Sequence, residues 1–112
     1  MVKDVLHFKH ELKKIFEENG WNENEGAPWD YIDYTLQLED GYCRILFRIR
    51  SLEDMFPMID VSLEYGKHQK TKEGMPYTIR DSKIVSVKND PDLSPKEFYN
   101  VLYKTCIRLI RS

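Results

Sequence analysis

Residues 31–50, YIDYTLQLEDGYCRILFRIR, contain the pattern that decides the fold. Two alternating apolar runs flank the pair Asp40-Gly41. Asp-Gly is the strongest short signal for a type I′ hairpin turn, because both central positions of that turn need a positive φ. A two-residue loop at this pair sets Leu38 opposite Cys43, and one face of the hairpin is then wholly apolar. A slip of one residue would destroy this face, so the sequence predicts an antiparallel hairpin with a core face and a polar face.

Helices are predicted on both sides of the strand region. Apolar residues recur at helical spacing from about residue 2 or 5 to residue 18, and Gly20 ends this helix so that Trp21 packs on Phe16 in a Schellman arrangement. Near the other end, Ser94 is a predicted N-cap and Glu97 completes a capping box. The second helix therefore starts after residue 94 and runs toward the end of the chain.

Two further strands are expected after the hairpin. A third strand alternates from Ile59 to Tyr65, and a five-residue loop before it would set Ile45 opposite Val61. Residues 66–81, which include the basic run 67–72, are expected to form a solvated loop, and a fourth strand follows at 83–88. We therefore predict a single α+β domain over 1–112, with two layers: an N-terminal helix, a four-stranded antiparallel meander and a C-terminal helix, both helices covering one sheet face.

Composition bounds the class of protein. The chain has 112 residues, of which 41% are hydrophobic and 32% charged, as expected of a folded soluble domain. A net charge of −2 gives no overall attraction to nucleic acid or membrane, so any such binding must be local. Cys43 and Cys106 fall on apolar faces and are expected to be buried free thiols, which favours a reducing compartment. With no membrane-span pattern or signal-peptide pattern, we expect a cytoplasmic protein.

The polar face of the hairpin is the first candidate binding surface. Arginine and tyrosine often carry interface energy, through planar hydrogen bonds and large amphipathic area. The alternative is a solvated face on which the arginines pair with carboxylates, for which the candidates are Asp33, Glu39, Asp60 and Glu64. The residues of this arginine–tyrosine face are Tyr31, Tyr42, Arg44, Leu46, Arg48 and Arg50.

The final helix is the second candidate surface. Its apolar residues extend over an arc of roughly 240°, which is more than packing on a sheet requires. Tyr99, Tyr103 and Ile107 extend the stripe and are the candidate contacts of a homodimer or a partner protein. The alternative is that the first helix covers the extra stripe.

No catalytic or cofactor motif is recognisable. The sequence has no Gly-x-Ser-x-Gly elbow and no phosphate-binding glycine loop, and His7 and His10 have no evident third metal ligand. We therefore predict a non-catalytic protein-binding module without cofactor or metal. Its partner is expected to be another protein or a second copy of the chain itself, as in a homodimer. In element order alone the chain is similar to small secretion-chaperone-like and immunity-type proteins. The alternatives are a nucleic-acid-associated accessory protein and an enzyme without a recognisable motif.

Overall fold

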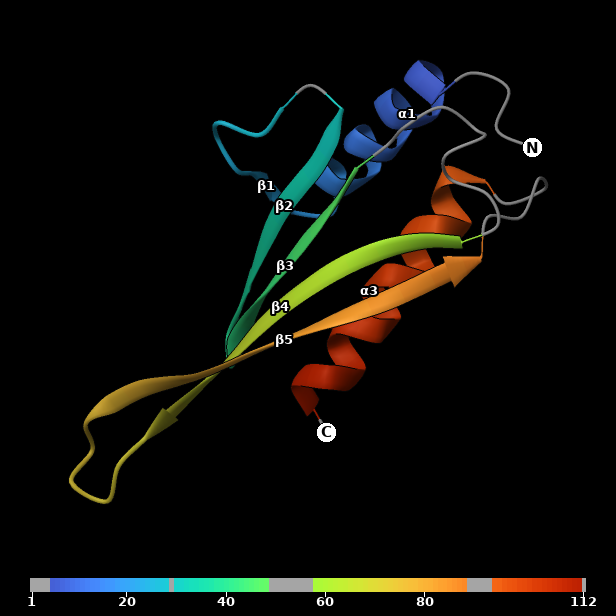
Figure 1. Ribbon diagram of the computed structural model, residues 1–112. Coiled ribbons are helices and arrows are strands. Elements are labelled where there is room, and N and C mark those ends of the chain that lie inside the picture. The colour runs from blue at the N-terminus through green and yellow to red at the C-terminus, as the bar shows by residue number, and fades with distance from the viewer. Residues whose placement is uncertain (1–4, 29, 49–57, 89–93, 112) are drawn as a thin grey trace.

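The computed structural model describes residues 5–28, 30–48, 58–88 and 94–111 (Figure 1). The strands form one antiparallel sheet in the order β1-β2-β3-β4-β5. The predicted α+β class is confirmed, with one strand more than the four expected, because two residues after the first helix pair with the sheet edge. The elements in chain order are α1 (Val5–Glu18), β1 (Asn22–Glu23), β2 (Tyr31–Leu38), β3 (Gly41–Arg48), β4 (Met58–Lys70), β5 (Pro76–Lys88) and α3 (Pro95–Arg111).

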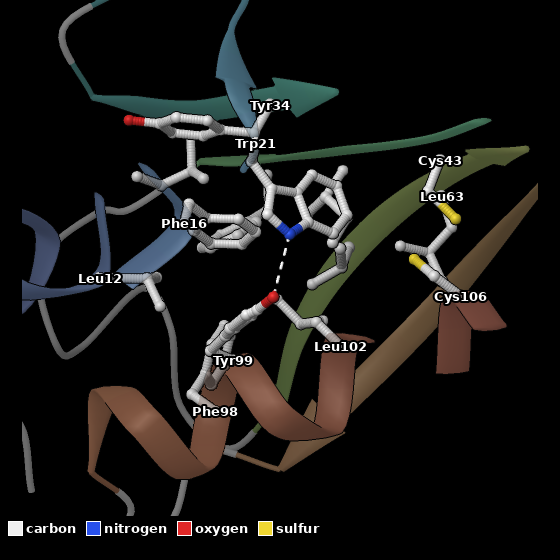
Figure 2. Close-up of a cluster of buried hydrophobic side chains, with 14 of the residues drawn as sticks. Leu12, Phe16, Trp21, Tyr34, Cys43, Leu63, Phe98, Tyr99, Leu102 and Cys106 are labelled. Carbon is white, nitrogen blue, oxygen red and sulfur yellow. Dashed lines mark hydrogen bonds between the residues drawn. The ribbon is translucent and has the colours of Figure 1, made fainter. Parts of the chain in front are cut away.

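Both helices pack on the same face of the sheet and share one hydrophobic core with it (Figure 1). The centre of this core is aromatic (Figure 2). The Phe16 ring stacks on Tyr34 of β2 at 5.0 Å between centroids and on Tyr99 of α3 at 5.1 Å. Stacked and edge-to-face rings bury large apolar area and add about 0.5–1.5 kcal/mol per pair. A single side chain of α1 therefore joins the sheet to the second helix.

The two predicted helix boundaries are confirmed. At the end of α1, Gly20 has a φ of 88°, its N–H donates to the Glu17 carbonyl, and the Trp21 N–H donates to the Phe16 carbonyl at 3.0 Å. This is a Schellman motif, and the Trp21 ring packs edge-on against Phe16. At the start of α3, the Ser94 Oγ accepts a hydrogen bond from the Glu97 N–H at 3.2 Å, as an N-cap does.

The predicted turn of the first hairpin is wrong, although its faces are right. Leu38 pairs with Gly41, so Glu39 and Asp40 form the turn and Gly41 is the first residue of β3. Gly41 is not among the glycines with positive φ. A Cβ on Gly41 would lie 2.0 Å from the Gly66 carbonyl oxygen of β4, so the glycine permits close strand approach instead of a left-handed turn. The register differs from the prediction by two residues, which keeps every side chain on its predicted face.

The prediction of an irregular segment over 66–81 is also wrong, because β4 and β5 are both long strands there. They pair from Met58↔Lys88 to Lys70↔Pro76. The far part of this hairpin, residues 67–80, extends away from the helices (Figure 1), and we call it the β4–β5 arm. Its turn closes with the Gly74 N–H donating to the Thr71 carbonyl, and Gly74 has a φ of 86°. The register of β4 on β3 also differs by two residues from the prediction, and the loop expected there lies outside the described residues.

Both cysteines are free and buried, as predicted. Their side chains come from β3 and α3 and lie near each other (Figure 2). A hydrogen bond with the Cys43 thiol, together with burial, raises the pKa of Cys106. Neither helix, over the residues described, is long and apolar enough to cross a membrane.

Candidate functional site

The arginine–tyrosine face is formed by outward-facing side chains of β2 and β3, and Arg44 is held there by a carboxylate. Its Nε and Nη2 donate to the two Asp33 oxygens at 2.9 and 2.8 Å, which is a bidentate ion pair. The Asn24 amide also donates to Asp33 Oδ1 at 2.7 Å. Hydrogen bonding from Arg44 lowers the pKa of Asp33 and raises that of the guanidinium itself. Asp33 is therefore an internal partner of this arginine.

Other polar members of this face are also satisfied within the chain. Arg48 pairs with Asp30, and this hydrogen bond lowers the pKa of the Asp30 carboxyl. The Tyr42 hydroxyl donates to Glu64 Oε1 at 2.7 Å. The predicted alternative for this face paired the arginines with Asp33, Glu39, Asp60 and Glu64. Arg44 does pair with Asp33, and its Nη1 lies 3.9 Å from Glu64 Oε2, whereas Asp30 was not anticipated. Asp30 lies just before β2, outside the alternating pattern from which partners could be read.

The remaining members of the face differ in accessibility. Tyr31 and Leu46 are half-buried. Arg50 lies outside the described residues. The described part of the surface therefore combines two half-buried apolar residues with paired charges.

Of the candidates on α3, Tyr99 is almost wholly buried. Its side chain is 4% exposed, its ring stacks on Phe16, and its hydroxyl accepts a hydrogen bond from Trp21 Nε1 at 3.0 Å (Figure 2). The end of α1 therefore covers this part of the apolar arc, as the alternative expected. Tyr103 is 37% exposed and packs edge-on against Tyr99, whereas Ile107 is half-buried.

A groove of about 620 Å³ lies where the end of α1, the first half of α3 and the end of β2 meet. We call it the helix groove. Its apolar lining is Ile15, Leu36, Leu38, Tyr99 and Tyr103, and its polar lining is Glu18, Asn19, Lys96 and Asn100. A lining of apolar side chains combined with polar ones is common in protein interfaces.

β2 continues past its pairing with β1 beside this groove. β1 pairs with β2 at Tyr34 and Thr35, and no described strand pairs with the outer edge of β2 at 36–38. The backbone groups of an unpaired edge can bind an extended peptide as an added strand. The groove and the edge together can hold an apolar side chain and the backbone that carries it.

Tyr99 and Tyr103 were predicted from the sequence as contacts on α3, whereas the other residues that line the groove were not predicted as site residues. Leu36 and Leu38 were predicted as core-face residues of the hairpin, and Ile15 as part of the helix stripe. Their periodicity shows that they face the helices, yet it does not show that a groove stays open beside them. No signal in the sequence would have revealed that opening.

The described residues bring together no group of three or more His, Cys, Asp or Glu side chains that could hold a metal ion. No protein-family model matches the chain, and comparisons with curated proteins and with solved structures gave no significant match.

Proposed function

We propose that this chain is a non-catalytic protein-binding module that recognises a segment of a partner protein in the helix groove. The observation that carries the proposal is the groove of about 620 Å³, lined by five apolar residues, beside the outer edge of β2 at 36–38, with which no described strand pairs. Tyrosine at such a site supplies a large contact area and loses little side-chain entropy on binding. The favoured ligand is an extended peptide with an apolar or aromatic side chain. We place the protein in the cytoplasm, consistent with its free thiols.

The arginine–tyrosine face is a second contact surface in this proposal. Arg44 and Arg48 already bind carboxylates of their own chain, so a partner must replace those contacts or use the groups as they stand. The half-buried Tyr31 and Leu46 provide apolar area at this face. A ligand of the helix groove needs no such replacement. We therefore favour the groove over the arginine–tyrosine face as the main binding site.

Selection from a displayed library of random peptides tests the proposal. Peptides that bind the immobilised protein should lose about tenfold or more in affinity with Tyr103→Glu, because a charge would then line an apolar contact. Val101→Glu is the matched control, since Val101 is also exposed on α3 and does not line the groove. Its affinity should stay unchanged.

A third variant, Tyr31→Glu, separates the two surfaces. Peptides sensitive to Tyr31→Glu and not to Tyr103→Glu would move the recognition site to the arginine–tyrosine face. Failure to select any peptide, or binding that is indifferent to both changes, would contradict the proposal. Circular dichroism and the thermal midpoint of each variant establish that the fold is retained.

Nucleic-acid binding is a second candidate function, and the β4–β5 arm supports it. Residues 67–80 contain Lys67, Lys70, Lys72 and Arg80 against one carboxylate, Glu73, although the chain as a whole is acidic. A two-stranded ribbon is narrow enough to enter the major groove of DNA. Oligonucleotide affinity that falls steeply with salt, and falls further with Lys70→Glu, would favour this candidate. Affinity independent of salt would exclude it.

A further inference from the structure

The outer edge of β5 is a long unpaired strand edge. β5 spans Pro76–Lys88 and is the last strand in the sheet order, so no described strand pairs with its outer side. It carries exposed apolar side chains, with Tyr77 44%, Ile79 48% and Ile84 64% exposed. Such an edge is a template for pairing with another strand, and natural proteins normally block or cover it.

This edge is complementary to itself in one symmetric antiparallel register. Ser82 is the midpoint of β5, and a two-fold axis through Ser82 would pair the strand along its whole length. Asp81 of one copy then lies opposite Lys83 of the second copy, and the same charge pair recurs across the axis. Ile79 lies opposite Val85 of the second copy. Opposite charges and apolar side chains that face each other directly stabilise paired strands.

Neighbouring registers lack this complementarity. An axis through Asp81 places that carboxylate opposite its own copy, and an axis through Lys83 does the same for the ammonium group. An axis through Arg80 sets the guanidinium opposite itself. An axis that falls between two residues would place core-facing side chains opposite outward-facing ones, since faces alternate along a strand. Directly opposed like charges are destabilising, and an axis through Ile84 sets Asp81 and Lys83 opposite Val87 and Val85, so the pattern favours the Ser82 axis.

The shape of the molecule supports the same arrangement. The far part of the β4–β5 hairpin extends beyond the helices (Figure 1), and Tyr77 and Ile79 are exposed. In the Ser82 register these residues lie beside Val87 and Val85 of the second copy. In each chain Val87 is buried and Val85 packs against the core. Pairing would therefore set the exposed apolar end of each arm next to the covered part of the other sheet.

We propose that the chain forms a symmetric homodimer by antiparallel pairing of β5 with β5 of a second copy, centred on Ser82. The dimer extends the proposed protein-binding function to a second copy as partner, at an edge separate from the helix groove. The two sheets become continuous, with the helices of both copies on the same side.

Charge exchange between Asp81 and Lys83 tests the pairing and its register. Each single variant, Asp81→Lys or Lys83→Asp, creates two like-charge pairs and should weaken dimerisation about tenfold or more. The double variant restores opposite charges and should dimerise as wild type does. A mixture of the two single variants should also dimerise, because each supplies the charge that the other needs. Light scattering over a concentration range gives the solution mass in each case.

A cysteine at the axis gives an independent measurement. Directly opposed residues in antiparallel strands have Cα atoms about 4.5–5.5 Å apart, within the range that a disulfide spans. Ser82→Cys should therefore crosslink to a covalent dimer on oxidation with diamide, and a reducing agent should reverse it. Ser86→Cys is the matched control, because Ser86 is exposed on the same face but lies opposite Thr78 of the second copy. It should crosslink much less.

Several outcomes would overturn the dimer. These are a wild-type monomer at all concentrations, a mass that rises without limit, or equal crosslinking by Ser82→Cys and Ser86→Cys. Dimerisation lost with Tyr103→Glu and kept in both charge variants would place the self-contact in the helix groove instead. Loss of peptide binding with an intact dimer would contradict only the proposed groove function, so the two proposals fail separately.

Discussion

Asp33 shows how a polar residue on the outer face of the sheet becomes structural. Its side chain is 7% exposed and accepts hydrogen bonds from Arg44 and Asn24. Asn24 also donates to Thr35 Oγ1 at 2.9 Å. The residue that follows β1 is therefore attached to β2 through both Asp33 and Thr35. Alternation along the strands predicted that Asp33 and Arg44 lie on one face. The observed register of β2 on β3 differs by two residues from the predicted one, and this shift brings the two side chains close enough to bind each other.

The stability of the fold should depend on pH through Asp33. Arg44 holds the pKa of Asp33 below its usual value in the folded state, so the ionised carboxylate stabilises the fold. This contribution is present above the unfolded pKa of about 3.9 and is lost as pH falls through the lower folded pKa. The free energy of unfolding should therefore exceed that of Asp33→Asn at neutral pH, and the difference should shrink below about pH 4. Urea denaturation at a series of pH values measures it, and a constant difference would contradict the assignment.

The pairing of β3 with β4 depends on two glycines with different surroundings. A Cβ on Gly41 would meet the backbone oxygen of Gly66 at 2.0 Å. A Cβ on Gly66 would meet the ring of Tyr42 at 2.2 Å, because that ring lies across the strand. Backbone cannot move aside without disturbing the ladder, whereas a side chain can change rotamer or be shortened.

Alanine at either glycine should destabilise the sheet by about 1–3 kcal/mol, the usual cost of overpacking. Shortening the neighbour with Tyr42→Leu should recover part of the loss for Gly66→Ala, and none of it for Gly41→Ala. A double-mutant cycle in urea denaturation separates these terms. Equal recovery of stability at both positions would contradict this assignment, because it would mean that the Tyr42 ring clashes with both alanines.

The strand elements also show where local signals mislead. The Asp40-Gly41 pair matched a turn signal, yet close approach to β4 competes for the same glycine. That competing use involves a strand far along the chain, so a local pattern cannot include it. The residues of the β4–β5 arm lie beyond the helices and need no apolar face, which explains why its alternation was weak enough to suggest a loop. By contrast, the Schellman motif and the Ser94 cap depend on adjacent residues and were predicted correctly.

At the scale of the whole molecule, a hydrogen bond between Trp21 and Tyr99 connects two segments that are 78 residues apart in the chain. Trp21 follows α1 and Tyr99 belongs to α3, so the bond connects the two helices above the sheet (Figure 2). Both side chains are buried, so the indole N–H relies on the hydroxyl as its partner.

Tyr99→Phe should lower the free energy of unfolding by about 1–3 kcal/mol, because it leaves the buried indole N–H without an acceptor. Tyr103→Phe is the matched control, since it removes a partly exposed hydroxyl one turn further along the same helix and should change stability by less than about 0.5 kcal/mol. Thermal and urea denaturation measure both. Equal effects of the two changes would mean that the buried hydrogen bond contributes nothing specific.

By itself the sequence determined the α+β class, the helix boundaries, the free thiols and the face on which each hairpin residue lies. These features depend on periodicity and on capping between near neighbours, which a chain displays locally. Tertiary structure alone decided the strand registers, the partners of Arg44 and Arg48, the burial of Tyr99 and the opening of the helix groove. Each of these depends on the distance between segments far apart in the chain, because close packing in three dimensions sets which surfaces are covered and which stay open.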